Sequence, residues 1–227
     1  MQGIESLAAL GTLEVGDEVV NPRDEAEAEW LAKRRGKITG SRFGEIIGTG
    51  RDDNEFTNAG YKYLRLVVAE RLGSYEIGFR AASTDWGNEY EPLAIAEYAE
   101  REGIEIDSGE FCFREYSKDV GATPDLIRID GNPGECKCPK DPAVHIETAI
   151  SEKVPPEYVW QCHGHILVTE GDFCDFMSFD PRIKPGQGPR LVVVRVNRDE
   201  KKLDYLRKRL DQAVEWVELV TNMLKRG

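Results

Sequence analysis

Apolar residues recur every three or four positions in several stretches of the chain, and this spacing is typical of helices with one buried face. Gly36, Gly73 and Gly103 follow three of these stretches, as expected at helix ends. The predicted helices cover residues 24–36, 40–47, 56–72, 85–102, 155–169 and 199–225. Their predicted core stripes are Tyr61, Leu64, Val68 and Leu72 in the third helix, and Leu203, Leu206, Leu210, Val214, Val217 and Leu224 in the last.

Short runs rich in β-branched and aromatic residues predict strands at 111–116, 126–129, 135–138, 172–180 and 190–197. The segment DGNPG, residues 130–134, is a strong turn signal, so we predict a hairpin around it. The order of elements predicts an α/β (α+β) fold with a central mixed sheet flanked by helices. Residues 24–227 form one predicted domain, and residues 1–23 form an N-terminal arm without a strong period.

Composition and charge narrow the class of protein. With 42 acidic and 30 basic residues among 227, the net charge is −12, which argues against a passive nucleic-acid coat but not against an enzyme with a small basic groove. We expect no membrane span, because the apolar runs are short, and no secretory signal. The five cysteines contain no CxxC pair, so we expect reduced thiols rather than a zinc or iron–sulfur framework.

The stretch VGATPDLIRIDGNPGECKCP, residues 120–139, carries the most informative chemistry. Glu135 and Lys137 are two apart in a predicted strand, so they share one face, while Cys136 and Cys138 point to the other. The hairpin returns Asp125 toward the same edge, although the register is not fixed by sequence. Carboxylate oxygens suit Mg²⁺ or Mn²⁺, and a neighbouring lysine can stabilise charge on a phosphate. The alternative is an exposed hairpin with an ordinary Glu–Lys pair.

Two further polar residues lie on predicted helices. Glu91 is within about 40° of Ile95 and Tyr98 around its helix, so it emerges from the apolar side and needs a partner there. A metal is one such partner, and an ion pair to a basic residue is the other. Gln161 is a candidate ligand for a phosphate or a water, or an ordinary polar helix residue.

Arg34, Thr39 and Ser41 flank a predicted helix start for which Thr39 is a good N-cap. Helix amides, a hydroxyl and a guanidinium together make an anion site, although a cap residue is often only a cap. His163 and His165 are about 200° apart on their helix, so we do not expect them to share a metal.

Five strings in this order resemble the family of the lambda-type exonucleases and YqaJ-type viral recombinases, within the PD-(D/E)xK nuclease superfamily. The resemblance spans about residues 30–198. The strings run from Trp30 to Ser41, then WGNEYE at 86–91, TPD and ECKCP within 123–139, YVWQ at 158–161 and FDPR at 179–182. The wider superfamily often has Gln-x3-Tyr on its helix, whereas this chain has His165 in place of the tyrosine.

The resemblance implies a restriction-endonuclease-like core and a role for each residue. Asp125, Glu135 and the backbone carbonyl of Cys136 would bind Mg²⁺, for which Mn²⁺ would substitute, and Lys137 would be the catalytic lysine. Glu91 would position a second metal or its waters, and Gln161 would complete the site. Arg34 and Ser41, with Thr39 beside them, would bind the 5′-phosphate.

The resemblance also implies an activity: an alkaline-type, Mg²⁺-dependent 5′→3′ exonuclease that degrades one strand of linear double-stranded DNA and leaves 3′ overhangs for phage-type recombination. It implies a homotrimer, a single-strand annealing protein as partner, and the bacterial or phage-infected host cytoplasm as location. The alternatives are an endonuclease of the same superfamily, an iron–sulfur nuclease with the same core, or a non-catalytic DNA-end-binding or protein-binding module.

Overall fold

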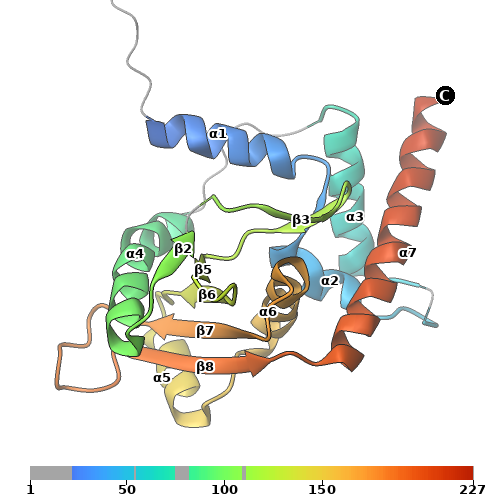
Figure 1. The fold of residues 1–227 in the computed structure, drawn as a ribbon. Coiled ribbons are helices and arrows are strands. Elements are labelled where there is room, and N and C mark those ends of the chain that lie inside the picture. The colour runs from blue at the N-terminus through green and yellow to red at the C-terminus, as the bar shows by residue number, and fades with distance from the viewer. Residues whose placement is uncertain (1–21, 54, 75–81, 109–110, 227) are drawn as a thin grey trace, which may run out of the picture.

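The structure is a computed structural model that describes residues 22–53, 55–74, 82–108 and 111–226 (Figure 1). The predicted arm, apart from Pro22 and Arg23, lies outside these residues. The helices are α1 Pro22–Arg34, α2 Phe43–Ile47, α3 Asn58–Arg71, α4 Ala82–Glu102, α5 Pro142–Ser151, α6 Pro156–Thr169 and α7 Glu200–Lys225, with a 3-10 turn η1 at Gly40–Arg42. The strands are β1 Ile38–Thr39, β2 Ile106–Ser108, β3 Arg114–Ser117, β4 Val120–Ala122, β5 Leu126–Arg128, β6 Pro133–Lys137, β7 Phe173–Phe179 and β8 Leu191–Asn197.

The predicted central mixed sheet is confirmed. Five strands lie in the order β2-β5-β6-β7-β8, in which only β6 and β7 are parallel neighbours. The chain joins these two strands through α5 and α6. A smaller sheet, β1-β4-β3, lies beside α1 and α3 in Figure 1. The hairpin predicted around residues 130–134 is also confirmed, with Leu126 opposite Gly134.

Helices cover both faces of the larger sheet, because strand β7 carries apolar residues on both of its sides. Phe176 packs with residues of α6, α3 and α7, and Met177 packs with Ala94 and Tyr98 of α4. Figure 1 shows α4 at the left of the sheet and α3 and α7 at the right. No helix in the described ranges is long and apolar enough to cross a bilayer.

Several local predictions are wrong. The predicted helix 40–47 is split into η1 and α2, and the Thr39 side chain does not cap it, because Thr39 lies beside the Tyr63 hydroxyl instead. Leu72 and Leu224 are 42% and 51% exposed, since both lie where their helices extend past the core. Residues 111–113 are not strand, and Phe111 takes a positive φ of 67°.

Strands β1, β2 and β4, helix α5 and the burial of Arg209 had no counterpart in the prediction. Helix α5 starts at Pro142, with Asp141 as an N-cap that accepts a hydrogen bond from the Ala143 amide at 2.9 Å. Arg209 of α7 is fully buried, and its guanidinium donates to backbone carbonyls of the segment 46–55, including those of Ile46 at 2.8 Å and Gly48 at 3.0 Å. A charged residue therefore takes a core position and fixes the end of α2.

Candidate active site

The register of the β5–β6 hairpin brings Asp125 to the strand that carries Glu135 and Lys137. The Asp125 amide donates to the Gly134 carbonyl at 3.1 Å. The amide of Cys136 in turn donates to Oδ2 of Asp125 at 2.6 Å. The Asp125 side chain is therefore fixed against the backbone between Glu135 and Lys137, which is the convergence that the sequence left open.

Glu135 is fully buried and is held from two directions. Its Oε1 forms an ion pair with Nζ of Lys137, so the two side chains share a face as predicted. Its Oε2 accepts a hydrogen bond from Nε2 of His165, on α6, at 2.6 Å. Cys136, between them in the strand, is buried on the other face against the α4 side of the core.

Glu91 reaches this group from α4, and its electrostatic environment shows how close the carboxylates are. Burial and the charge of Asp125 raise the pKa of Glu91 from 4.5 to about 9. Burial and the charge of Glu135 raise the pKa of Asp125 from 3.8 to about 6. For Glu135, burial opposes ionisation, but Lys137 and His165 outweigh it and lower the pKa. Asp125 and Glu135 thus lie on either side of the Cys136 amide, and Glu91 lies near enough for the charge of Asp125 to raise its pKa.

A cavity of about 450 Å³ opens beside these residues, at the end of β6. Glu91 and Lys137 lie in its wall, and Tyr158 of α6 supplies an aromatic surface. Lys137 Nζ lies 5.4 Å from the centre of the Tyr158 ring, which itself stacks on Phe176. The cavity therefore places charged and apolar walls next to each other. Its remaining lining residues are Gly87, Cys136, Cys138, Pro139, Lys140, Val144, Thr148, Pro155 and Ser178.

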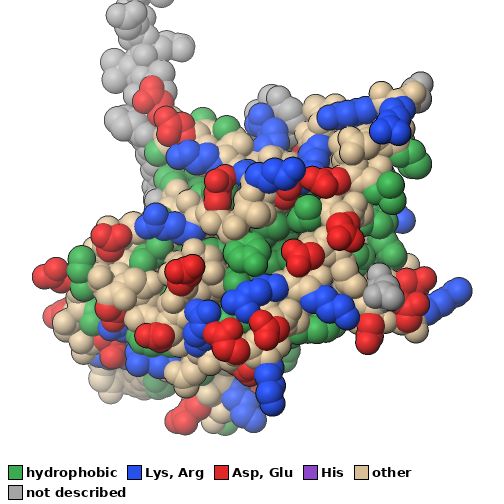
Figure 2. Space-filling model, turned by 45° about the vertical axis from the view of Figure 1, so that its right-hand side comes forward, with side chains coloured by type: hydrophobic (Ala, Val, Ile, Leu, Met, Phe, Trp, Pro, Cys, Tyr) green, Lys and Arg blue, Asp and Glu red, His purple; other side chains and the backbone are tan. Residues whose placement is uncertain are grey.

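A larger hollow of about 830 Å³ lies at the turn of the β5–β6 hairpin and the C-terminal end of α6. Two of its arginines are already engaged, because Arg128 pairs with Asp130 at 2.8 Å and Arg207 pairs with Asp204 at 2.7 Å. On the face that Figure 2 shows, basic and acidic side chains alternate without a continuous basic stripe. We therefore place the candidate active site in the smaller cavity.

The three residues of the predicted anion site differ in their surroundings. Arg34 is half-buried, its partial burial lowers its pKa, and its Nη1 donates to Oγ1 of Thr123 at 3.3 Å. The Trp30 indole donates to the same oxygen at 2.8 Å, and the Arg34 guanidinium stacks over the Trp30 ring at 4.1 Å. Since Thr123 is two residues before Asp125, Arg34 is anchored to the segment that enters the carboxylate cluster.

The turn that carries Thr39 and Ser41 also borders the cluster. A Cβ on Gly40 would lie 2.6 Å from Cβ of Ala122 and 3.7 Å from Cε1 of His165, so the turn packs directly against the histidine that holds Glu135. The Thr39 hydroxyl is 3.5 Å from the Tyr63 hydroxyl, and Ser41 is exposed.

Comparison with known proteins shows the family. The model of the YqaJ-like viral recombinase domain matches residues 29–172, which include Arg34, Glu91, Asp125 and Glu135. The chain belongs to the YqaJ-like viral recombinase family. Among curated proteins, none is significantly similar to it.

Solved structures show how far the likeness to this YqaJ-like chain extends. An alkaline exonuclease, LHK-Exo from Laribacter hongkongensis, has a TM-score of 0.76 and 26% identity, over 88% of this chain and 96% of that one. LHK-Exo in complex with dAMP has a TM-score of 0.77 and 27% identity, with coverages of 88% and 96%. A phage-related exonuclease from Haemophilus somnus 129PT has a TM-score of 0.67, with coverages of 82% and 96%, and its 20% identity supports the fold alone.

Gln161 of the YqaJ-like domain lies one turn before His165 on α6 and is 8% exposed. In the described part of the chain, no hydrogen bond joins it to the three carboxylates. His165, to which the sequence analysis gave no role in the site, is the residue of α6 that donates a hydrogen bond to Glu135. The available signal was its place in the position that the wider superfamily often gives to tyrosine.

His163 and His165 lie in different surroundings on α6. Both ring nitrogens of His163 are buried without a partner among the described residues, and burial lowers its pKa to about 4. Cys136 and Cys138 are free thiols, which agrees with the expectation of reduced cysteines.

The carboxylate oxygens of this site suit a divalent cation, although they do not form a ready cage for one. Across the described ranges, no three His, Cys, Asp or Glu side chains are grouped as a ready metal cage. The reason is local, because Lys137 and His165 occupy the two oxygens of Glu135. Yet burial and the charge of Glu135 raise the pKa of Asp125, burial and the charge of Asp125 raise that of Glu91, and a bound cation would offset this repulsion among the carboxylates.

Proposed function

We propose that this protein is a Mg²⁺-dependent exonuclease that degrades one strand of linear double-stranded DNA from its 5′ end and leaves a 3′ single strand. Membership of the YqaJ-like viral recombinase family and the likeness to an alkaline exonuclease support a DNA exonuclease role. The single observation that carries the proposal is the convergence of Asp125, Glu135, Lys137 and Glu91 beside one cavity.

Asp125, Glu135 and the backbone carbonyl of Cys136 would hold Mg²⁺, with Glu91 acting directly or through water. When bound, Mg²⁺ polarises a phosphate oxygen and lowers the pKa of an attacking water. Hard oxygen donors favour Mg²⁺ or Mn²⁺ over softer metals, and the neighbouring thiols of Cys136 and Cys138 lie on the other face of the strand or at its end.

The protein's own residues would divide the work of cleavage among them. Glu135 holds the Lys137 ammonium at the cavity, where that charge would stabilise negative charge developing on the scissile phosphate. Burial opposes protonation of Lys137, but the charges of Glu135 and Asp125 outweigh it and raise its pKa, so the lysine stays cationic. We assign Lys137 electrostatic stabilisation rather than the role of a general base.

The DNA end would be recognised by the adjacent basic segment. Arg34 is anchored through Thr123, and with Ser41 and Thr39 it would bind the 5′-phosphate. A cavity of about 450 Å³ with an aromatic wall at Tyr158 has room for one mononucleotide, and dAMP is bound by the similar exonuclease. We therefore propose 5′-mononucleotides as the product.

A digest of three substrates tests the proposal. Linear duplex labelled at the 5′ end, linear duplex labelled at the 3′ end and closed-circular duplex are incubated with Mg²⁺ or with EDTA. With Mg²⁺, we expect linear duplex to release mononucleotides from its 5′ ends and circular duplex to stay intact. With EDTA, we expect no product. Cutting of circles would establish an endonuclease instead, and digestion in EDTA would reject the metal.

Two lysines provide the matched variants for this digest. Lys137→Met should lower the rate by about 10²–10³-fold, the usual cost of one charge-stabilising donor. Lys184→Met, an exposed lysine in the loop between β7 and β8, should not change it. Equal rates for the two variants would reject Lys137 as the catalytic lysine.

We also propose a homotrimer and a single-strand annealing protein as partner, both from the family resemblance. Sedimentation of the purified protein tests the first, with a monomer or dimer as the contradicting result. Co-purification with the annealing protein of the same genome tests the second.

A further inference from the structure

The FDPR string, residues 179–182, supplies no residue to the proposed mechanism, yet its polar groups are closely organised. Asp180 follows β7 and is 2% exposed. The guanidinium of Arg182 donates to both oxygens of this carboxylate, at 2.7 Å and 2.8 Å. The pKa of Asp180 is lowered by that hydrogen bond, so the pair is ionic.

The same guanidinium also contacts the loop that follows the Glu135–Lys137 strand. Nη1 of Arg182 donates to the carbonyl of Lys140 at 3.0 Å, and Nη2 approaches the carbonyl of Pro139 at 3.4 Å. Each of its three nitrogens is thus used, in a fork geometry that lysine cannot reproduce. The loop begins directly after Lys137, so its position bears on where the ammonium lies.

The face of the guanidinium meets a third segment. It lies 5.5 Å from the centre of the Trp86 ring, in the first part of α4. Trp86 packs on Tyr90, with ring centres 4.4 Å apart, and Glu91 is the next residue. Arg182 therefore contacts Pro139 and Lys140, which line the candidate cavity, and it contacts Trp86 on α4, the helix that contributes Gly87 and Glu91 to the same lining.

We propose that Arg182 is a positioning residue that sets the separation of Glu91 from Lys137 by tying α4 to the β6–α5 loop. This inference rests on the proposed function. Within the described residues, none of the hydrogen bonds of Arg182 goes to Asp125, Glu135 or Glu91, so it acts through the backbone and the Trp86 ring. Its side chain is 44% exposed, so its removal opens no core cavity.

Three variants and two measurements test this role. Arg182→Met keeps the length of the side chain but removes the fork, Arg182→Lys keeps the charge, and Lys184→Met is the control from the same turn. We expect Arg182→Met to digest linear duplex about 10- to 100-fold more slowly, because small misplacements of reacting groups have effects of that size. Mn²⁺ binding without DNA, measured by calorimetry, should weaken about tenfold.

A merely structural role would not produce this combination. We expect Arg182→Lys to recover part of both losses and Lys184→Met to match the wild type. In a cycle with Glu91→Gln, the Arg182→Met change should have little further effect, because both act on one group. If Arg182→Met does not fold, Arg182→Lys decides by the same two measurements.

The results separate the two proposals. A wild-type protein that does not digest linear duplex with Mg²⁺ overturns the proposed function, and the role of Arg182 with it. A wild type that digests it, together with an Arg182→Met variant of equal rate and equal Mn²⁺ affinity, overturns the role of Arg182 alone. Additive losses in the Glu91 cycle, or a slower rate with unchanged Mn²⁺ affinity, also overturn it.

Discussion

Glu135 shows how a buried carboxylate is kept ionised and oriented in this protein. It has no exposed surface, and each of its oxygens faces one cationic or donor group, Lys137 or His165. An unpaired buried carboxylate would be strongly disfavoured, so these partners are needed for folding as well as for the proposed chemistry. His165 therefore has a structural role, and in the proposed chemistry it would also orient Glu135.

The first prediction concerns His165→Ala. It removes the donor to Oε2 of Glu135, and we expect a loss of about 1–3 kcal/mol in unfolding free energy, the usual cost of an unsatisfied buried group. Because the carboxylate is also freed to turn, nuclease activity should fall about 10- to 100-fold. Urea denaturation and the linear-duplex digest measure the two effects. His165→Gln, which keeps a donor, should recover part of each, and an Ala variant as active and stable as the wild type would contradict the assignment.

His163 gives a second prediction at this scale. Burial lowers its pKa from 6.5 to about 4 in the folded protein, so the unfolded chain binds the proton more readily. Its contribution to stability is therefore complete above about pH 6.5 and is lost as the pH falls toward about 4. The difference in unfolding free energy between wild type and His163→Gln, measured by urea denaturation across this range, should shift in favour of the variant as the pH falls. A constant difference would contradict the prediction.

Sequence could predict a residue's face but not its partner. The spacing of Glu135 and Lys137 fixed their common face, because strand side chains alternate. The contact of Asp125 with the Cys136 amide depends on the hairpin register, and that of His165 depends on how α6 lies across the sheet. Both are tertiary relations with no local pattern.

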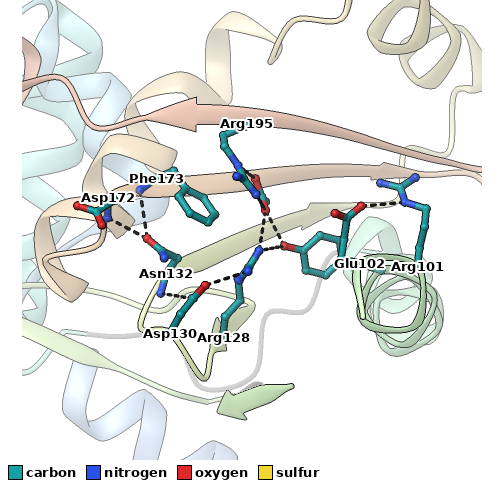
Figure 3. A network of polar contacts seen from close by, with 10 residues as sticks. Arg101, Glu102, Arg128, Asp130, Asn132, Asp172, Phe173 and Arg195 are labelled. Atoms are coloured by element: carbon teal, nitrogen blue, oxygen red, sulfur yellow. Dashed lines mark hydrogen bonds and ion pairs between the residues drawn. The ribbon is translucent and has the colours of Figure 1, made fainter. Parts of the chain in front are cut away.

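At the scale of elements, α4 must be held in place if Glu91 is to reach the cluster. A buried polar network does this at its C-terminal half (Figure 3). The hydroxyl of Tyr98 donates to Oδ2 of Asp175, on β7, at 2.6 Å. Arg195 donates to both oxygens of Asp175, at 2.8 Å and 2.9 Å, and Arg128 approaches at 3.4 Å, so two arginines converge on one carboxylate from β8 and β5.

The third prediction follows from that convergence. Asp175→Ala would leave Arg128 and Tyr98 without their buried acceptor, and we expect a loss of roughly 3–5 kcal/mol, as for other broken buried ion pairs. Tyr98→Phe removes the hydrogen bond donated to Asp175 and the one accepted from Arg128 at 3.1 Å, and it should cost about 1.5–3 kcal/mol. Thermal unfolding measures both. Glu102→Gln, on the exposed end of the same helix, is the control; an Asp175→Ala variant as stable as this control would show that the network does not anchor α4.

The elements themselves were predicted with uneven success, for identifiable reasons. The hairpin carries a strong turn signal in DGNPG. Strands β7 and β8 carry equally local signals in their runs of β-branched and aromatic residues. Helix α5 was not predicted, although Asp141 and Pro142 form a recognisable start. On α7, the predicted buried stripe wrongly included Leu224, which is exposed. Arg209 of the same helix is buried in the core, because backbone carbonyls of a distant segment accept its hydrogen bonds.

At the scale of the whole molecule, the parallel pairing of β6 and β7 is what assembles the site. It sets Lys137 beside Ser178 and brings the end of β7, with Asp180 and Arg182, to the loop after Lys137. The chain between the two strands contributes Tyr158 and His165 from α6. Three carboxylates, one from α4 and two from the β5–β6 hairpin, thus lie near one another. When no cation is bound, the repulsion among them lowers the stability of the fold.

The last prediction concerns how the stability of the protein depends on pH with and without Mg²⁺. In the metal-free protein, burial and mutual repulsion raise the pKa of Asp125 to about 6 and that of Glu91 to about 9. A carboxyl group with a raised folded-state pKa makes its full contribution to stability below its ordinary pKa, and this contribution is lost as the pH rises through the raised value. With EDTA, stability should therefore fall between about pH 6 and about pH 9, where the folded protein still holds the Glu91 proton that the unfolded chain has released.

Mg²⁺ competes with protons for the same oxygens, so the rise in melting temperature on adding Mg²⁺ should be larger at about pH 9 than at about pH 6. Glu91→Gln cannot ionise and should make that rise nearly independent of pH over this window, whereas Glu97→Gln, on the same helix, should behave as the wild type. Thermal unfolding at the two pH values, with Mg²⁺ and with EDTA, decides the matter. An equal effect of Mg²⁺ at both pH values in the wild type would mean that the coupled carboxylates do not bind the metal.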